Sequence, residues 1–359
     1  MRAPFIVWRY LATEFVRAFL GTLAAICAIF LVIDFVDRAK AYTGEGWQRD
    51  AAILYGYKAI TVAYQLAPAA LLLAGAIAVA GFRRRGEYTA MRALSISPLQ
   101  LLVPIALVAG LIVSGMMIAD ELVVGSASRH VDDITTSRFH SYGDWRTFFG
   151  QTSWFRGKRH IYHLREGDAD EGFRKVTIFT LSDDFRLARR IDAREMKPLQ
   201  GRTWRLVDGR ERTLGEGSEL RPFATLDLTF DEEPTSFRIA KGRPEQLPLR
   251  SLVEQITLRE NVGLPVERYL LALHNKAAYP LAGLPAALLA ATVTLRPGRK
   301  GYLTEAVADG FFVILWLWAL MVISKAAALA GYVSAGPAAW GPVLVMALLA
   351  SIAAFRSAR

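Results

Sequence analysis

Residues 81–100 read GFRRRGEYTAMRALSISPLQ and join two long apolar runs, yet they contain more than a short connector needs. Neither residues 59–82 nor residues 93–119 contain Asp, Glu, Lys or Arg. A helix needs about 20 apolar residues to cross the hydrocarbon core of a bilayer, so both runs predict membrane spans. The arginines at 83–85 mark the end of the first span, and a charged, helix-like segment follows them before the second. The connection therefore predicts a separate helix at a membrane surface.

The whole chain of 359 residues, 53% of them hydrophobic, has the composition of an integral membrane protein. The first apolar run is too long and too close to Asp34 to be a cleaved signal peptide, and no small-residue cleavage site follows it. No short-period repeat is present. We expect six spans, roughly at 12–36, 53–82, 98–119, 268–295, 306–330 and 338–355.

The formal charge of +10 belongs to the membrane part of the chain. Residues 120–268 contain 25 basic and 25 acidic residues, so the excess lies outside them and does not indicate nucleic-acid binding. Basic residues gather on alternate sides of consecutive spans, which by the positive-inside rule predicts cytoplasmic termini and residues 120–265 on the opposite side. The clusters are Arg2, Arg9 and Arg17; Arg83, Arg84, Arg85 and Arg92; Arg296, Arg299 and Lys300; and Arg356 and Arg359.

The segment between the third and fourth spans changes from helical to alternating patterning. Apolar and polar residues alternate there as they do in half-buried strands. The alternating stretches are residues 161–164, 176–181, 204–207 and 226–230, and Phe237 and Ile239 repeat the pattern. Short strands with polar turns favour an antiparallel sandwich or open barrel. The pattern SLVE at Ser251 is a capping box and predicts a short linker helix.

These patterns predict an α+β membrane protein with three plus three transmembrane helices and an inserted antiparallel β domain. The expected domains are 1–119 with a surface helix at about 86–96, then 120–265 with the β domain and linker helix, and then 266–359.

The predicted surface helix has one apolar face, formed by Tyr88, Met91 and Leu94, while Glu87 and Arg92 project elsewhere. One interpretation is an interfacial helix that shields the loop. The other is a docking helix for a cytoplasmic partner, in which the acid among arginines gives specificity.

Ionisable residues in or beside spans usually line a cavity or extend to the interface. Lys58 and Lys276 lie near span ends, so we expect their ammonium groups to extend to the membrane interface.

His160 and His163 have metal-compatible spacing, but nothing nearby completes a site, and we predict neither metal nor cofactor. The chain has no P-loop, G-x-S-x-G or H-E-x-x-H motif, so no catalytic residue is predicted and ATP hydrolysis requires another subunit. The single cysteine, Cys27, excludes an intramolecular disulfide framework.

Four strings, in this order and spacing, resemble the LptF/LptG permease family of the bacterial lipopolysaccharide exporter. They are FVD at 35–37, E-x-x-x-M-R-A at 87–93, VDG at 207–209, and RYLLALHNKAAYPLAGLPAALLA at 268–290. The resemblance covers essentially the whole chain, and FVD is more similar to the LptG branch than to LptF.

The resemblance implies a non-catalytic permease subunit in the inner membrane that extracts lipopolysaccharide and passes it to a periplasmic bridge. Its partners would be an LptF-like subunit, an LptB-like ATPase dimer and an LptC-like bridge protein, and its β domain would be a periplasmic jellyroll. The helix between spans two and three would be the ATPase-coupling helix, with Glu87 at the family's acidic contact position. The coupling residues would be Glu87, Tyr88, Met91, Arg92 and Leu94.

Lipid would reach the family's site beside the first span, at Leu31, Phe35, Arg38 and Lys40. Arg38 and Lys40 would attract lipid phosphates at headgroup depth, although the alternative is that they are ordinary interfacial anchors. The chain departs from the family at Asp34, where a basic residue is usual. Two other functions stay open: an LptF paralogue, and a mechanotransmitting scaffold without lipid transport.

Overall fold

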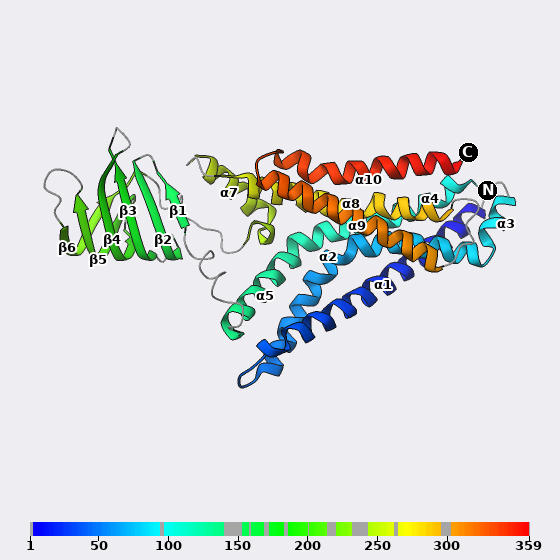
Figure 1. Ribbon diagram of the computed structural model, residues 1–359, viewed down its shortest axis with the longest axis horizontal. Coiled ribbons are helices and arrows are strands. Elements are labelled where there is room, and N and C mark those ends of the chain that lie inside the picture. Colours follow the sequence, from blue (N-terminus) through cyan, green and yellow to red (C-terminus); the bar gives the residue numbers. More distant parts are fainter. Residues whose placement is uncertain are drawn as a thin grey trace. The chain divides into compact units, whose positions relative to one another are not determined.

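A computed structural model of the protein describes residues 3–93, 97–139, 153–157, 159–168, 172–182, 186–199, 201–213, 220–231, 243–261, 265–295 and 303–358 (Figure 1). The chain divides into two compact units. A helical unit comprises Met1–Phe139, Pro244–Leu249 and Glu267–Arg359, and a second unit comprises His140–Arg243 and Arg250–Val266.

The described residues of the helical unit contain six candidate membrane spans, which confirms the prediction. The third is an unbroken helical run in which a π-helical turn, η2, connects α4 to α5. The remaining helical elements are the short helix α3 and the 3-10 turns η1 and η5. Their bounds are α1 (Ala3–Arg38), η1 (Ala39–Ala41), α2 (Trp47–Arg84), α3 (Glu87–Ala93), α4 (Pro98–Ala119), η2 (Asp120–Val124), α5 (Gly125–Arg138), η5 (Pro244–Gln246), α8 (Glu267–Leu295), α9 (Leu303–Leu329) and α10 (Ala335–Ala358).

Two helices are longer than their apolar runs. α2 begins at Trp47 rather than near residue 53, and the run that starts with α4 continues to Arg138 rather than ending near residue 119. The extensions are polar, and helix formation does not require a membrane around every turn. Apolar composition therefore marks the membrane-crossing part of each helix and not its ends.

Small residues allow α2 and α8 to approach closely. A Cβ atom added to Gly75 would overlap the carbonyl oxygen of Ala287, and one added to Gly283 would lie 2.7 Å from Leu71 Cδ1. Membrane helices commonly pack through such small side chains because the hydrophobic effect does not hold them together in lipid. α8 is the most enclosed span, with 72% of its most apolar stretch buried.

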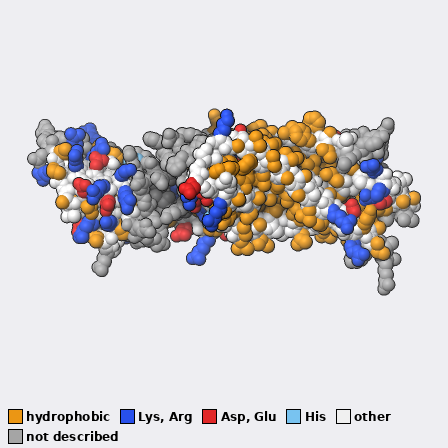
Figure 2. Space-filling view, turned by 90° about the horizontal axis from the view of Figure 1, so that it is seen from below, with side chains coloured by type: hydrophobic (Ala, Val, Ile, Leu, Met, Phe, Trp, Pro, Cys, Tyr) orange, Lys and Arg blue, Asp and Glu red, His pale blue; other side chains and the backbone are white. Residues whose placement is uncertain are grey.

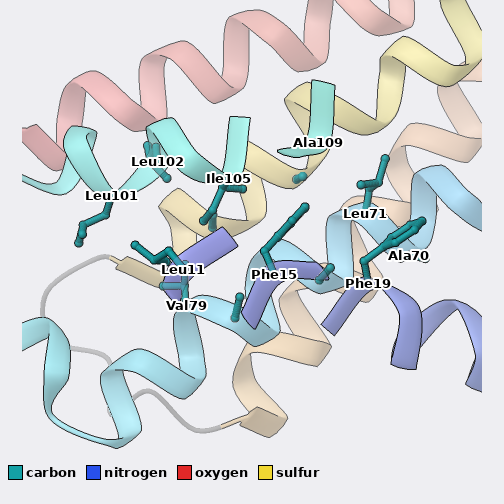
Figure 3. Packing of buried hydrophobic residues seen from close by; sticks show 14 of the residues in the cluster. Leu11, Phe15, Phe19, Ala70, Leu71, Val79, Leu101, Leu102, Ile105 and Ala109 are labelled. Carbon is teal, nitrogen blue, oxygen red and sulfur yellow. The ribbon is translucent and has the colours of Figure 1, made fainter. Parts of the chain in front are cut away.

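Among the described residues of α1, the buried side chains lie in the first half of the helix. Leu11, Phe15 and Phe19 are buried among α2 and α4 residues (Figure 3). By contrast, no residue in 20–41 is buried. The most apolar stretch of α1 is accordingly only 6% buried, and that of α9 only 11% buried. These two helices present apolar surface that the described chain does not cover.

The sequence signals around residues 81–100 form the predicted separate helix, α3. Gly86 (φ +73°) precedes it in the left-handed conformation that favours glycine. The next helix begins with a capping box, in which the Ser97 hydroxyl accepts from Gln100 N (3.3 Å) and the Gln100 side chain accepts from Ser97 N (3.1 Å).

The described residues of the second unit form a six-stranded antiparallel sheet whose strands pair in sequence order. β2, β3, β5 and β6 cover segments with the predicted alternation, whereas β1 and β4 were not predicted; Phe237 and Ile239 lie outside the described residues. All described strand pairs are between sequence neighbours, so the jellyroll stays a prediction. The bounds are β1 (Ser153–Arg156), β2 (His160–Asp168), β3 (Gly172–Leu181), β4 (Leu187–Pro198), β5 (Thr203–Thr213) and β6 (Leu220–Thr229).

The two faces of the sheet differ in chemistry. Trp204, Tyr162 and Phe173 are almost fully buried in an apolar cluster. Ion pairs lie elsewhere on the strands, including Arg205 Nε with Asp227 Oδ1 at 2.8 Å. This unit also contains all but the first residue of the predicted linker helix, α7 (Leu249–Asn261). The helix begins two residues before Ser251, so Ser251 lies in its first turn and is not the N-cap that the SLVE pattern predicted.

The surface of the helical unit agrees with a membrane protein. In the view of Figure 2 it presents a broad band of hydrophobic side chains, with Lys, Arg, Asp and Glu gathered beyond the band. A bilayer solvates such a band favourably, whereas the charged groups stay in the headgroups and water.

Candidate functional site

α3 lies with its apolar side on the helical bundle. Met91 is buried and Tyr88 is half-buried, and both belong to the core that contains α1, α2 and α4. Thr89, Ala90, Arg92 and Ala93 are exposed. The predicted residue Leu94 lies outside the described residues. Of the five predicted coupling residues, Tyr88 and Met91 therefore hold α3 in place, whereas Arg92 lies on its open face.

Glu87 faces the first helix of its own chain. Its Oε1 atom accepts from Arg85 Nε (2.7 Å) and from the Tyr10 hydroxyl (3.3 Å). The Arg85 guanidinium also lies 3.9 Å from Glu14, and the hydrogen bond to Glu87 raises the pKa of Arg85. The Oε2 atom of Glu87 has no hydrogen-bond partner among the described residues. Glu87 thus connects α3 to α1 and keeps one oxygen without a donor from this part of the chain.

A second arginine connects α3 to the end of α8. The Arg83 guanidinium donates to the Thr294 carbonyl oxygen (2.6 Å) in the last turn of α8 and lies 6.0 Å from the Tyr88 ring centroid. A cation near a helix C-terminus also interacts favourably with the helix dipole. α3 is therefore held from three helices, α1, α2 and α8.

The four residues predicted to meet lipid lie at the C-terminal end of α1 and in η1. Leu31 is half-buried, and Lys40 is exposed. Phe35 stacks on Tyr42 (5.6 Å between ring centroids) and meets Tyr55 edge-on at 5.5 Å. An aromatic cluster, which also includes Phe139, thus surrounds the α1–α2 connection.

Asp34 collects three donors at this end of α1. Its Oδ1 atom accepts from Arg38 Nε (3.0 Å), while its Oδ2 atom accepts from the Tyr55 hydroxyl (2.7 Å) and pairs with the Lys58 ammonium. The expected snorkelling of Lys58 is therefore wrong, because its ammonium turns to a carboxylate on the neighbouring helix. Tyr55 and Lys58 were not predicted as site residues. The signal that could have indicated them was that Lys58 follows Asp34 by 24 residues, on the next predicted span.

Lys276 is also paired rather than extended toward the interface. Its ammonium lies 2.8 Å from Asp120 Oδ2 and 3.4 Å from Glu121 Oε2. Both acids belong to the π-helical turn η2, and such turns are frequent at functional sites. The Glu121 carboxylate in addition accepts from Leu249 N at 2.9 Å and 3.0 Å.

Residues 244–249, which lead into the linker helix, are hydrogen-bonded to α5 beside this ion pair. Gln246 Nε2 donates to Ser128 Oγ (2.9 Å) and Asp132 Oδ2 (2.7 Å), and its carbonyl oxygen accepts from Arg129 (2.6 Å). The Gln246 carbonyl also approaches Gly125 so closely that a Cβ atom there would lie 2.6 Å away. Residues 244–249 are consequently part of the helical unit.

Among the described residues, no group of three or more His, Cys, Asp or Glu side chains lies close enough to hold a metal ion. His160 packs its ring against Phe230 (5.3 Å between centroids) and Tyr162 (5.8 Å), which is a packing role.

Comparison with known proteins identifies the family. No curated protein matched the chain in a sequence comparison. Residues 9–356 match the family described as lipopolysaccharide export system permease LptF/LptG. The match includes all six candidate spans, α3 and the sheet. Members of this family are membrane permease components of the lipopolysaccharide export machinery rather than enzymes. The chain belongs to the LptF/LptG family of lipopolysaccharide export permeases.

Proposed function

We propose that this protein is the LptG-like permease subunit of an ABC-type exporter that extracts lipopolysaccharide from the inner membrane and passes it to a periplasmic bridge. The observation that carries the proposal is the uncovered apolar surface of α1 and α9, whose most apolar stretches are 6% and 11% buried in a chain of the permease family. A helix that its own chain leaves uncovered meets lipid, substrate or a partner subunit.

The basic clusters support the orientation. Arg83, Arg84 and Arg85 lie at the end of α2, and Arg356 lies near the end of α10. The positive-inside rule assigns these ends, with α3, to the cytoplasm and the inserted sheet to the periplasm.

α3 is the proposed coupling helix for an LptB-like ATPase dimer. The exposed positions Thr89, Ala90, Arg92 and Ala93 offer the docking surface, while Met91 and Tyr88 transmit its motion to the bundle. Glu87 acts at the edge of that surface: its Oε1 atom accepts from Arg85 and Tyr10 and so fixes α3 against α1, while its charge contributes to the specificity of the contact with the ATPase.

The C-terminal end of α1 is the proposed lipid-access site. Lys40 is exposed and binds a lipid phosphate group. Arg38 supplies a second cation at this site while it pairs with Asp34. Leu31 and Phe35 contact acyl chains. An LptF-like subunit covers α9, whose side chains Phe312, Trp316 and Trp318 are 61–70% exposed.

Affinity purification of the full chain from its native membrane tests the proposal. Mass spectrometry should identify lipopolysaccharide, an ATPase and a second permease subunit of the LptF type, and lipopolysaccharide should stimulate ATP hydrolysis by the complex. A second subunit of the LptG type would instead make this chain the LptF paralogue. Recovery without lipopolysaccharide or an ATPase would favour a scaffold.

A further inference from the structure

Two ion clusters that the described membrane-spanning helices contain, one around Lys276 and one around Asp34, have opposite formal charge. Around Lys276, one cation faces two carboxylates, Asp120 and Glu121. Around Asp34, one carboxylate faces two cations, Arg38 and Lys58. The formal charge is therefore −1 at the first cluster and +1 at the second. Of these two clusters, the one around Asp34 carries the charge that attracts a further anion.

The groups around Asp34 form the donor set that a phosphate requires. A guanidinium (Arg38), an ammonium (Lys58) and a phenol hydroxyl (Tyr55) converge on its two oxygens from α1 and α2. Phosphate groups bind through the same charge-assisted hydrogen bonds that bind a carboxylate. The side chains of Asp34, Lys58 and Arg38 are 12%, 13% and 34% exposed, so the donors are shielded from bulk water yet open on the Arg38 side.

The surroundings indicate that the competing anion comes from a lipid. The aromatic cluster at the α1–α2 connection, to which Trp47 also belongs, lies beside the site. Trp and Tyr side chains concentrate at the depth of lipid headgroups. No residue in 20–41, which covers the second half of α1 and η1, is buried, so a lipid can approach along this helix. Headgroup phosphate at this depth meets the donors without crossing the hydrocarbon core.

We propose that Asp34 is an internal ligand of a lipid-phosphate site formed by Arg38, Lys58 and Tyr55, and that it yields these donors to an incoming headgroup phosphate. The proposal rests on the proposed lipid-access role of α1 and adds two residues of α2, Tyr55 and Lys58, to it. Because the phosphate must replace existing ion pairs, Asp34 weakens lipid binding and keeps it reversible. The carboxylate also keeps Lys58 paired when no lipid is present.

The test measures binding of bisphosphorylated lipid A, and of the same lipid A after dephosphorylation, to the full chain in nanodiscs. Asp34→Asn should bind the phosphorylated lipid about tenfold more tightly, a change of about 1.4 kcal/mol, and the dephosphorylated lipid unchanged. The matched control is Asp37→Asn, which removes an equal charge from an exposed residue of the same helix. An equal gain in both variants would reduce the effect to net charge and overturn the proposal.

Lys58→Gln keeps the test decisive if Asp34→Asn does not fold. It removes one donor, so phosphate-dependent binding should weaken about tenfold, and Asp34→Asn/Lys58→Gln should lack the gain of Asp34→Asn. Unchanged binding in Lys58→Gln would overturn the proposal. A gain for inorganic phosphate alone, without one for lipid A, would reject the lipid as ligand.

Failure of the wider lipid-access role has a different signature. If Lys40→Gln leaves phosphate-dependent binding unchanged while Asp34→Asn strengthens it, the internal-ligand proposal stands and the role of Lys40 fails. If Lys40→Gln weakens binding while Asp34→Asn matches Asp37→Asn, the access site stands and the internal ligand fails.

Discussion

The Lys276 ammonium lies 2.8 Å from the Asp120 carboxylate and joins α8 to the π-helical turn that follows α4. Their side chains are only 13% and 9% exposed. The neighbouring Glu121 shares Lys276 and binds Leu249 N, so this pair lies beside the segment that leads back into the membrane. We therefore expect this pair to stabilise the contact between α8, η2 and the segment that ends at Leu249.

Lys276→Met should destabilise the helical unit by about 3–5 kcal/mol, because it leaves the Asp120 carboxylate buried without its cation. Thermal unfolding of the full chain in detergent measures the change. Lys325→Met is the control: Lys325 lies 3.2 Å from Glu245, but these side chains are 48% and 55% exposed, so its loss should cost less than about 1 kcal/mol. Equal melting shifts for the two variants would contradict the structural role of Lys276.

In the sheet, Gly209→Ala should lower stability by about 1–3 kcal/mol through overpacking. A Cβ atom at this position would lie 2.5 Å from the Asp192 carbonyl oxygen and would overlap the Phe223 ring. Pulse proteolysis of the full chain in urea reports the free energy of unfolding of the sheet. Arg210→Ala, at an exposed position next to it, should stay within about 0.5 kcal/mol of the parent, and a similar loss there would reject the packing argument.

The sequence predicted the spans and α3 because apolar run length and basic clusters are local signals. It also predicted that Tyr88 and Met91 share an apolar face, and both lie against the bundle. It did not predict that Lys58 and Lys276 are paired. Their partners, Asp34 and Asp120, are distant in sequence, and only the antiparallel packing of α1 with α2 and of α4 with α8 brings them together.

Strand β4 was missed for a related reason. Its sequence LARRIDAREMKP is rich in charge, yet Ile191, Ala193 and Met196 are buried. The spacing from Ala193 to Met196 departs from strict alternation, so the period-two pattern is broken where the strand is central in the sheet.

Glu87→Arg should abolish coupling or prevent assembly with the ATPase. The change places a positive side chain beside Arg85 and removes the acceptor for Tyr10, and like charges across a docking surface cost several kcal/mol. Complex yield and lipopolysaccharide-stimulated ATP hydrolysis measure the effect. Thr89→Arg, on the exposed side of α3, separates docking from internal positioning: it should reduce assembly without lowering the melting temperature of the isolated chain.

The orientation of the chain predicts opposite labelling of two exposed threonines. After Cys27→Ser removes the single cysteine, Thr89→Cys on α3 and Thr213→Cys on β5 introduce one thiol each. In intact spheroplasts an impermeant thiol reagent should label position 213 and not 89, and lysis should expose 89. Labelling of 89 alone in intact cells would invert the proposed topology.

The most direct test of the lipopolysaccharide-access role places a photo-crosslinking amino acid at Leu31, with Leu111 of α4, which is 73% exposed, as a control that also faces the membrane. In the complete complex, position 31 should form adducts with lipopolysaccharide that require the ATPase partner and decrease in Lys40→Glu, while position 111 should capture bulk phospholipid. Adducts with bulk phospholipid alone at both positions would contradict lipid access along α1.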